Sequence, residues 1–288
     1  MKNFTSFFQN QIWILFLGMT ALSSCDDPID VSLDQGPVRL VVDGWLYQNL
    51  TTPTTTPDTI KLRYTSSYFS NSPAPKASHG FVTITDNTGL VDTLLEVSPG
   101  QYITRNTVRE VGRSYKLTVK IDGETYEAFT ELKLAPLIDS VKAIYVDEDR
   151  GPQGKGFYLY YFGPENIGPG DFYRFNLYEN GRFLNSPDDL AFTDDRFLKD
   201  EVYIDSLEIN FAPFKEGDTI RTETLSISED AFYFFAEMQT QINNGGLFAQ
   251  PPANVRSNIK NVNPKGPEAQ GYFGASGLTW YQTVCKKQ

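Results

Sequence analysis

The sequence is poor in the side chains that most metal and catalytic sites use. It has one histidine, His79, and two cysteines, Cys25 and Cys285, in 288 residues. These are too few for a Cys/His zinc cluster, and a Ser-His-Asp triad would have to use His79. Residues 76–80 around that histidine contain no nucleophile motif. We therefore expect His79 to be a loop residue, Cys285 to be an incidental thiol, and the chain to have no catalytic residue, cofactor or metal ligand.

Basic side chains are also few. The chain has 25 Lys plus Arg against 36 Asp plus Glu, a net charge of −11, and a pI of about 4.7. Its longest basic run is the pair Lys286-Lys287. A nucleic-acid-binding surface needs clustered Lys and Arg to neutralise phosphates. This composition excludes nucleic acid as a partner.

No apolar run is long enough to cross a bilayer, which takes about 20 residues. The segment Ile12–Leu22 is apolar but shorter than that, and it fits the central region of a secretory signal peptide. The next residues, Leu22-Ser23-Ser24-Cys25, resemble a bacterial lipobox. We therefore expect a signal peptide at 1–24, lipid on Cys25 and a tether at 25–37. The acidic residues after Cys25 resemble the surface-export signals of Bacteroidetes lipoproteins, so we expect an outer-membrane protein on the cell-surface side.

From Val38 onward, the dominant pattern is the alternation of apolar and polar residues that is typical of half-buried antiparallel strands. Residues 115–121 show it most clearly. Turn signals such as Asp122-Gly123 separate the runs. The predicted strands of this half lie at 38–42, 60–64, 81–86, 91–97, 101–105, 115–121 and 124–132. About seven short strands in roughly 100 residues predict an immunoglobulin-like β-sandwich over residues 38–135.

A second, mainly antiparallel β domain is predicted over residues 136–288, because the pattern restarts after Ala135-Pro136. One helix is predicted near 229–243, with Ser226 and Glu229 at capping-box spacing. The predicted strands of this half lie at 139–146, 156–162, 172–180, 202–211 and 218–227. The sequence as a whole predicts an all-β fold with a single helix.

Pairs of acidic residues are frequent in the second half. A glycosidase needs two carboxylates held roughly 5–10 Å apart in a cleft, and adjacency in sequence does not establish that. Solvated loop acids and a loop-bound Ca²⁺ are the other interpretations, although no EF-hand loop is present. The pairs in question lie at 147–149, 188–189, 194–195 and 200–201.

Aromatic residues crowd one predicted strand of the second domain. Alternation places Tyr158 and Tyr160 on one of its faces and Phe157 and Tyr161 on the other, so both faces are apolar. One face packs on the core, and the other is either a stacking platform for a ligand or an interface. Tyrosine suits such a site because it buries much apolar area while keeping a hydroxyl for a partner. We predict binding at Tyr158 and Tyr160.

The loop at 250–258, after the predicted helix, is the second candidate contact surface. Its predicted binding residues are Pro252, Asn254 and Asn258.

Several short segments together resemble the Bacteroidetes lipoprotein family that carries domain of unknown function 4249, whose members are usually encoded beside TonB-dependent receptors. The segments are Leu40–Trp45, 100–102, 112–117, 135–140, Asp171–Phe175, 251–255 with 258–259, and Gly271–Phe273. The match covers nearly all of the chain after Cys25. Where family members often have two prolines before the boundary, this chain has Ala135-Pro136. The resemblance implies an accessory role in outer-membrane uptake or surface assembly, and it brings no catalytic residues.

Three functions remain open. The first is a non-enzymatic lipoprotein that captures or gates the ligand of a TonB-dependent transporter. The second is a secreted glycan or peptide hydrolase that uses a carboxylate pair. The third is a structural or adhesive surface subunit. We favour the first hypothesis, with a TonB-dependent receptor and the outer membrane as partners.

Overall fold

The computed structural model describes residues 36–54, 56–67, 70, 72–148, 153–165, 170–196, 203–244 and 253–287. The predicted signal peptide, Cys25, most of the tether and Pro252 lie outside these residues. The described residues from Val38 onward form a single compact unit.

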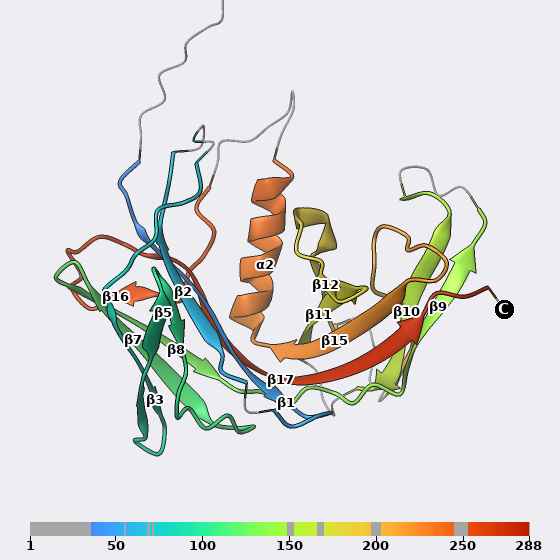
Figure 1. Cartoon of the computed structure of the whole chain (residues 1–288), viewed down its shortest axis with the longest axis horizontal. Coiled ribbons are helices and arrows are strands. Elements are labelled where there is room, and N and C mark those ends of the chain that lie inside the picture. The colour runs from blue at the N-terminus through green and yellow to red at the C-terminus, as the bar shows by residue number, and fades with distance from the viewer. Residues whose placement is uncertain are drawn as a thin grey trace, which may run out of the picture. The chain divides into compact units, whose positions relative to one another are not determined.

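Strands dominate the described residues (Figure 1). They are β1 (Leu40–Asn49), β2 (Thr59–Tyr64), β3 (Phe81–Asp86), β4 (Val91–Thr93), β5 (Leu95–Ser98), β6 (Gln101–Ile103), β7 (Ser114–Ile121), β8 (Glu124–Glu131), β9 (Ser140–Val146), β10 (Gly156–Pro164), β11 (Phe172–Glu179), β12 (Arg182–Phe183), β13 (Ala191–Asp194), β14 (Tyr203–Glu208), β15 (Thr219–Ile227), β16 (Lys260–Asn261) and β17 (Gln270–Val284). One α-helix, α2 (Glu229–Ile242), lies among them, with a short 3₁₀ turn at Pro187–Asp189. The prediction of an all-β fold with one helix is confirmed.

A nine-stranded sheet runs through the molecule in the order β12-β11-β15-β17-β1-β2-β6-β5, with β13 also paired to β11. Its longest strand, β17, has 15 residues and pairs parallel to β1, whereas the other pairs of this sheet are antiparallel. Strand β17 was not predicted from the sequence. Glycines at 271, 274 and 277 interrupt its apolar pattern and hide the strand.

The predicted division into residues 38–135 and 136–288 does not match this sheet. Strands β1, β2, β5 and β6 come from the first range, and β11, β12, β13, β15 and β17 come from the second. The expected N-terminal sandwich is present as two packed sheets, but β17 and β16 from the far end of the chain complete those sheets. Pairing between strands so distant in sequence leaves no local pattern, and therefore the periodicity could not indicate it.

Three apolar cores hold the sheets together. The first lies between the nine-stranded sheet and the sheet β16-β8-β7-β3-β4, and Leu46 and Tyr115 are buried in it. The second lies against the sheet β14-β10-β9 and includes Phe157 and Cys285. The third packs α2 on the nine-stranded sheet through Phe232 and Phe235. The helix stands on the concave side of that sheet (Figure 1).

The helix begins at Glu229, as predicted, but its N-cap lies two residues after the predicted Ser226. Ser228 is the N-cap, and its hydroxyl accepts a hydrogen bond from the Ala231 amide at 3.1 Å. Ser226 is instead a buried residue at the end of β15. The serine side chain at a cap must face the first helical turn, and Ser226 is still in the extended strand. No helix in the described part of the chain has the length and apolar character needed to cross a membrane.

Cys285 is fully buried beside β17, and burial raises the pKa of its thiol to about 11. The thiolate is the reactive form of cysteine. At Cys285 the raised pKa keeps the thiolate fraction low, and burial keeps reagents away from the sulfur. In a Cys25→Ser chain, Cys285 should react with a thiol reagent at least about 100-fold more slowly than it does in denaturant. Absorbance measures both reaction rates. A native rate close to the rate in denaturant would contradict the burial of Cys285.

Candidate functional site

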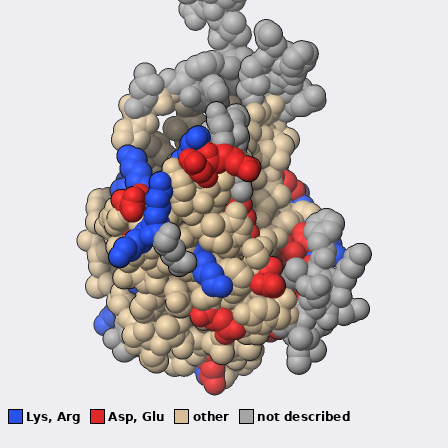
Figure 2. Space-filling model, turned by 90° about the vertical axis from the view of Figure 1, so that its right-hand side faces the viewer, with Lys and Arg blue, Asp and Glu red and all other residues tan. Residues whose placement is uncertain are grey.

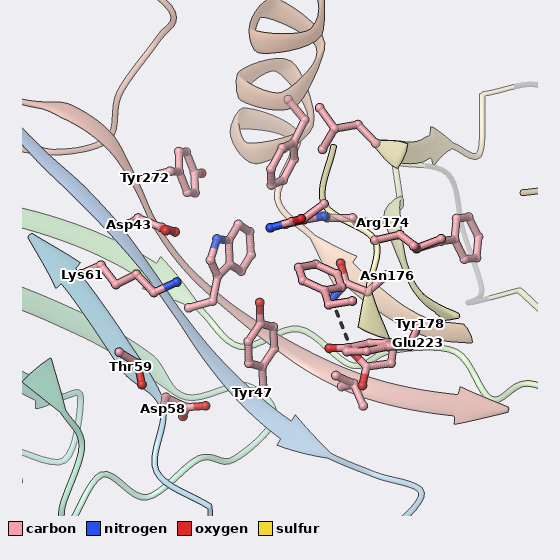
Figure 3. Close-up of a pocket in the computed structure, with 18 of the residues that line it drawn as sticks. Asp43, Tyr47, Asp58, Thr59, Lys61, Arg174, Asn176, Tyr178, Glu223 and Tyr272 are labelled. Atoms are coloured by element: carbon pink, nitrogen blue, oxygen red, sulfur yellow. Dashed lines mark hydrogen bonds between the residues drawn. The ribbon is translucent and has the colours of Figure 1, made fainter. Parts of the chain in front are cut away.

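A pocket of about 830 Å³ opens on the α2 side of the nine-stranded sheet (Figure 3). Its walls come from β1 and β2 on one side, from β11 and β15 on the other, and from α2. A cavity of this size falls in the range of small-molecule sites. The pocket is therefore our candidate site.

The alternation of β1 divides its side chains between the core and the pocket. Leu40, Val42 and Leu46 are buried in the first core, and the intervening Trp45 and Tyr47 line the pocket. The same period of two on β11 sends Tyr173 and Leu177 into the second core. It leaves Arg174, Asn176 and Tyr178 on the pocket side (Figure 3).

Trp45 is the centre of an aromatic wall. Its ring stacks on Phe235 and on Tyr272, each with a centroid separation of 5.9 Å, and on Tyr47 at 6.4 Å. Gly274 lies opposite Trp45 in the β1–β17 register, and a Cβ there would come within 3.0 Å of the indole. This glycine therefore provides the space that the indole fills. The wall offers a flat apolar surface to a ligand.

The acidic groups that line the pocket all have partners. Asp43 lies 3.8 Å from Arg63, and Asp58 lies 3.3 Å from Arg109. The carboxylate of Asp189 accepts hydrogen bonds from the backbone amide and hydroxyl of Ser186.

Glu223 is the most heavily bonded of these acids. It accepts hydrogen bonds from Arg221 at 2.7 Å, and from Asn176 and Tyr178 at 3.3 Å each (Figure 3). Burial, reinforced by the negative charge of Glu223, raises the pKa of Tyr178 to about 12. The phenol stays protonated at neutral pH and continues to donate. This network fixes the floor of the pocket, and it suits holding a molecule more than exchanging protons with one.

Asp58 is nearly buried, and this burial raises the pKa of its carboxyl to about 6, although Arg109 and the Tyr47 amide act to lower it. The ordinary value is 3.8. Between those two values the folded protein binds the proton more tightly than the unfolded chain does. Stability from this group is therefore present at low pH and is lost as the pH rises through about 6.

Replacing Asp58 by Asn should remove this dependence. The unfolding free energy of Asp58→Asn minus that of the wild type should rise by about 2–3 kcal/mol between pH 4 and pH 8. Urea unfolding at several pH values measures it. The variant Asp188→Asn removes an exposed carboxylate and serves as the control. If the unfolding free energies of Asp58→Asn and the wild type changed equally with pH, burial would not raise the pKa of Asp58.

The residues that the sequence analysis chose for binding lie outside this pocket. Tyr158 is fully buried, and its hydroxyl donates to the backbone carbonyls of Gln153 and Gly154. Tyr160 is half-buried, and its hydroxyl donates to Glu208 at 2.8 Å. A fully buried ring offers no surface to a partner, so Tyr158 would have to be uncovered first. Contact at these rings stays a prediction.

The loop candidates are also apart from the described pocket lining. Asn254 is exposed. The Asn258 amide donates to the Phe273 carbonyl at 2.7 Å, and its oxygen accepts from the Phe273 amide at 3.0 Å. Asn258 thus bonds to β17 as a strand residue would, which is a structural role.

Three carboxylates converge elsewhere, at Glu165, Asp171 and Asp195, whose ligand oxygens all lie within 4.8 Å of one another. Burial raises the pKa of Glu165, and the charges of Asp195 and Asp171 add to this. These oxygens are the kind that Ca²⁺ uses, so they are the group in the described residues that can hold a metal. The sequence pair 194–195 is split, because Asp194 bonds to Arg196. None of the three acids lines the large pocket.

On the face that Figure 2 shows, Lys and Arg side chains are interspersed with Asp and Glu rather than gathered in a patch of one sign. His79 is exposed, with a ring nitrogen 4.0 Å from Glu96. Neither feature adds a second candidate site.

The principal pocket residues were not predicted from the sequence; they are Trp45, Tyr47, Lys61, Arg174 and Tyr272. A signal was available. The segments that carried the family resemblance include Leu40–Trp45, Asp171–Phe175 and Gly271–Phe273, and these contribute Trp45, Arg174 and Tyr272. Nothing local showed that three such distant segments meet.

Comparison with known proteins gives one finding. No curated protein matches the chain. The model of the family described as "Domain of unknown function (DUF4249)" matches residues 26–281, which is most of the sequence. The chain therefore belongs to the DUF4249 family.

Proposed function

We propose that this protein is a non-enzymatic outer-membrane lipoprotein, exposed at the cell surface, that captures a small ligand for a TonB-dependent transporter. The observation that carries the ligand-capture part is the pocket of about 830 Å³, lined by stacked aromatics and by acids that all have partners. The lipobox-like sequence at Leu22–Cys25 supports the membrane anchor. Two acyl chains matter physically, because one chain alone holds a protein to a membrane only marginally.

The anchor is tested by Cys25→Ser. Palmitate label should disappear from the protein, which should then accumulate as an uncleaved precursor or a soluble species. Retained label would contradict lipidation at Cys25.

The partner is tested by purifying the tagged, lipidated protein from detergent-solubilised outer membrane and identifying the proteins that accompany it by mass spectrometry. A TonB-dependent receptor should be recovered at near-stoichiometric amount. A matched chain that carries the same signal and lipobox followed by a foreign soluble domain controls for proteins that follow any lipid anchor. Equal recovery of the receptor with both chains, or none with either, would refute the transporter role.

A further inference from the structure

Two cationic side chains in the pocket stand outside its ion pairs. Three of its cations form the ion pairs Arg63–Asp43, Arg109–Asp58 and Arg221–Glu223. The remaining two are Lys61 on β2 and Arg174 on β11. Neither makes a side-chain hydrogen bond or an ion pair with any residue that the structure describes. The described lining holds these five cationic side chains against four acids, Asp43, Asp58, Asp189 and Glu223, in a protein with a net charge of −11.

Arg174 is placed to act on a ligand. It reaches from β11 toward β1 (Figure 3), and its guanidinium carbon lies 4.4 Å from the centre of the Phe235 ring. Burial lowers the pKa of Arg174, while nearby Tyr47 and Asp43 act to raise it. A half-buried guanidinium has five N–H donors, and leaving them unbonded away from water is costly. Stacking on Phe235 fixes the plane of the group but satisfies none of these donors.

The surroundings of Arg174 supply two further ligand contacts. The aromatic wall of Trp45 and Tyr272 is flat and apolar. Asn176 is nearly buried in the pocket lining, and its side-chain oxygen has no hydrogen-bond partner among the described residues. The site thus combines a planar cation, an aromatic surface and one unused acceptor.

We infer that the ligand is an organic carboxylate with a flat ring, whose carboxylate pairs with Arg174 and whose ring lies against Trp45 and Tyr272. A guanidinium and a carboxylate match in geometry and form two parallel hydrogen bonds, a fit that an ammonium group does not provide. Lys61, which is exposed, adds attraction at the pocket edge. Because this names the ligand class of the captured molecule, it rests on the proposed function.

The test uses naphthalene-2-carboxylate and its uncharged partner naphthalene-2-carboxamide, titrated into the protein by calorimetry. The wild type should bind the carboxylate about tenfold or more tightly than the carboxamide. The variant Arg174→Gln should lose about tenfold or more in carboxylate affinity and little for the carboxamide. Arg174→Lys should recover only part of the loss, since it restores the charge without the paired donors.

Lys61→Gln should weaken carboxylate binding about two- to threefold, because an exposed charge contributes less. The exposed Arg182, which bonds to Glu179 outside this pocket, gives the control variant Arg182→Gln, which should bind as the wild type does. The comparison of the two probes on the wild type does not depend on how any variant folds. Equal affinity for the two probes, no saturable binding of either at 1 mM, or unchanged carboxylate affinity in Arg174→Gln would overturn the inference.

Recovery of the receptor separates this inference from the function on which it rests. If only the ligand class is wrong, the transporter should still co-purify with the Arg174→Gln protein. Carboxylate binding without receptor recovery would leave the ligand class standing and refute the transporter role.

Discussion

Gly271→Ala should destabilise the protein by more than about 4 kcal/mol, which is an exceptional loss for one methyl group. Gly271 pairs with Val42 in the parallel β1–β17 register and has φ of +96°. A Cβ at this position would fall well inside 3.0 Å of the Val42 carbonyl oxygen, which is backbone and has nowhere to move. The cost therefore has two parts, the strain of a left-handed alanine and the separation of the central strands.

A matched control separates the two parts. Gly89 has a similar φ of +89°, but a Cβ there would meet nothing within 4 Å. Gly89→Ala should thus show the conformational cost alone, about 1 kcal/mol. Urea unfolding of both variants gives the comparison. If Gly271→Ala lost no more than Gly89→Ala, then β17 would not run beside β1 as described, and the single unit from Val38 to Gln288 would be in doubt.

The local parts of this fold could be predicted from the sequence, and the long-range parts could not. Alternation located β3 and β7, because each is half-buried and has one apolar face. The helix was found from the spacing of Phe232 and Phe235, which still pack on the sheet. Strand β17 was not predicted because glycines interrupt its apolar pattern, and their reasons lie in the neighbouring strand. Gly271 lets the Val42 backbone approach, and Gly274 makes room for the Trp45 ring. Those needs are set by residues more than 200 positions away, so no window of sequence contains them.

The candidate site was missed for the same reason. Tyr158 and Tyr160 were chosen because aromatic residues are dense on β10, yet that strand is central in its own sheet, between β14 and β9, and has little free surface. Arg174 stands in a strand with similar aromatic density, and nothing local distinguishes a guanidinium that faces a pocket from one that forms an ion pair. Three distant strands have to be placed side by side before Arg174 is recognisable as unpaired.

Trp45→Ala should cost about 3–5 kcal/mol of stability and lower the thermal midpoint by on the order of 10 °C. Trp45 is nearly buried, and its ring contacts Tyr47, Phe235 and Tyr272. Its removal opens a cavity between β1 and α2 and takes away the surface on which the helix packs. The flat wall of the pocket disappears with it, so affinity for naphthalene-2-carboxylate should fall in the same variant.

Trp280→Ala provides the comparison, because Trp280 is a half-buried tryptophan at the margin of the third core, with its ring centre 4.7 Å from the Arg221 guanidinium carbon. The unfolding free energy of Trp280→Ala should fall by about 1–2 kcal/mol, because folding buries less apolar area at Trp280 than at Trp45. Trp45→Phe, which keeps an aromatic ring against Phe235, should recover more than half of the stability lost in Trp45→Ala. Urea unfolding monitored by circular dichroism measures all three variants without depending on tryptophan emission. Equal losses in Trp45→Ala and Trp280→Ala would mean that the stack around Trp45 does not hold α2 on the sheet, and the pocket would then lack the rigid wall that ligand capture requires.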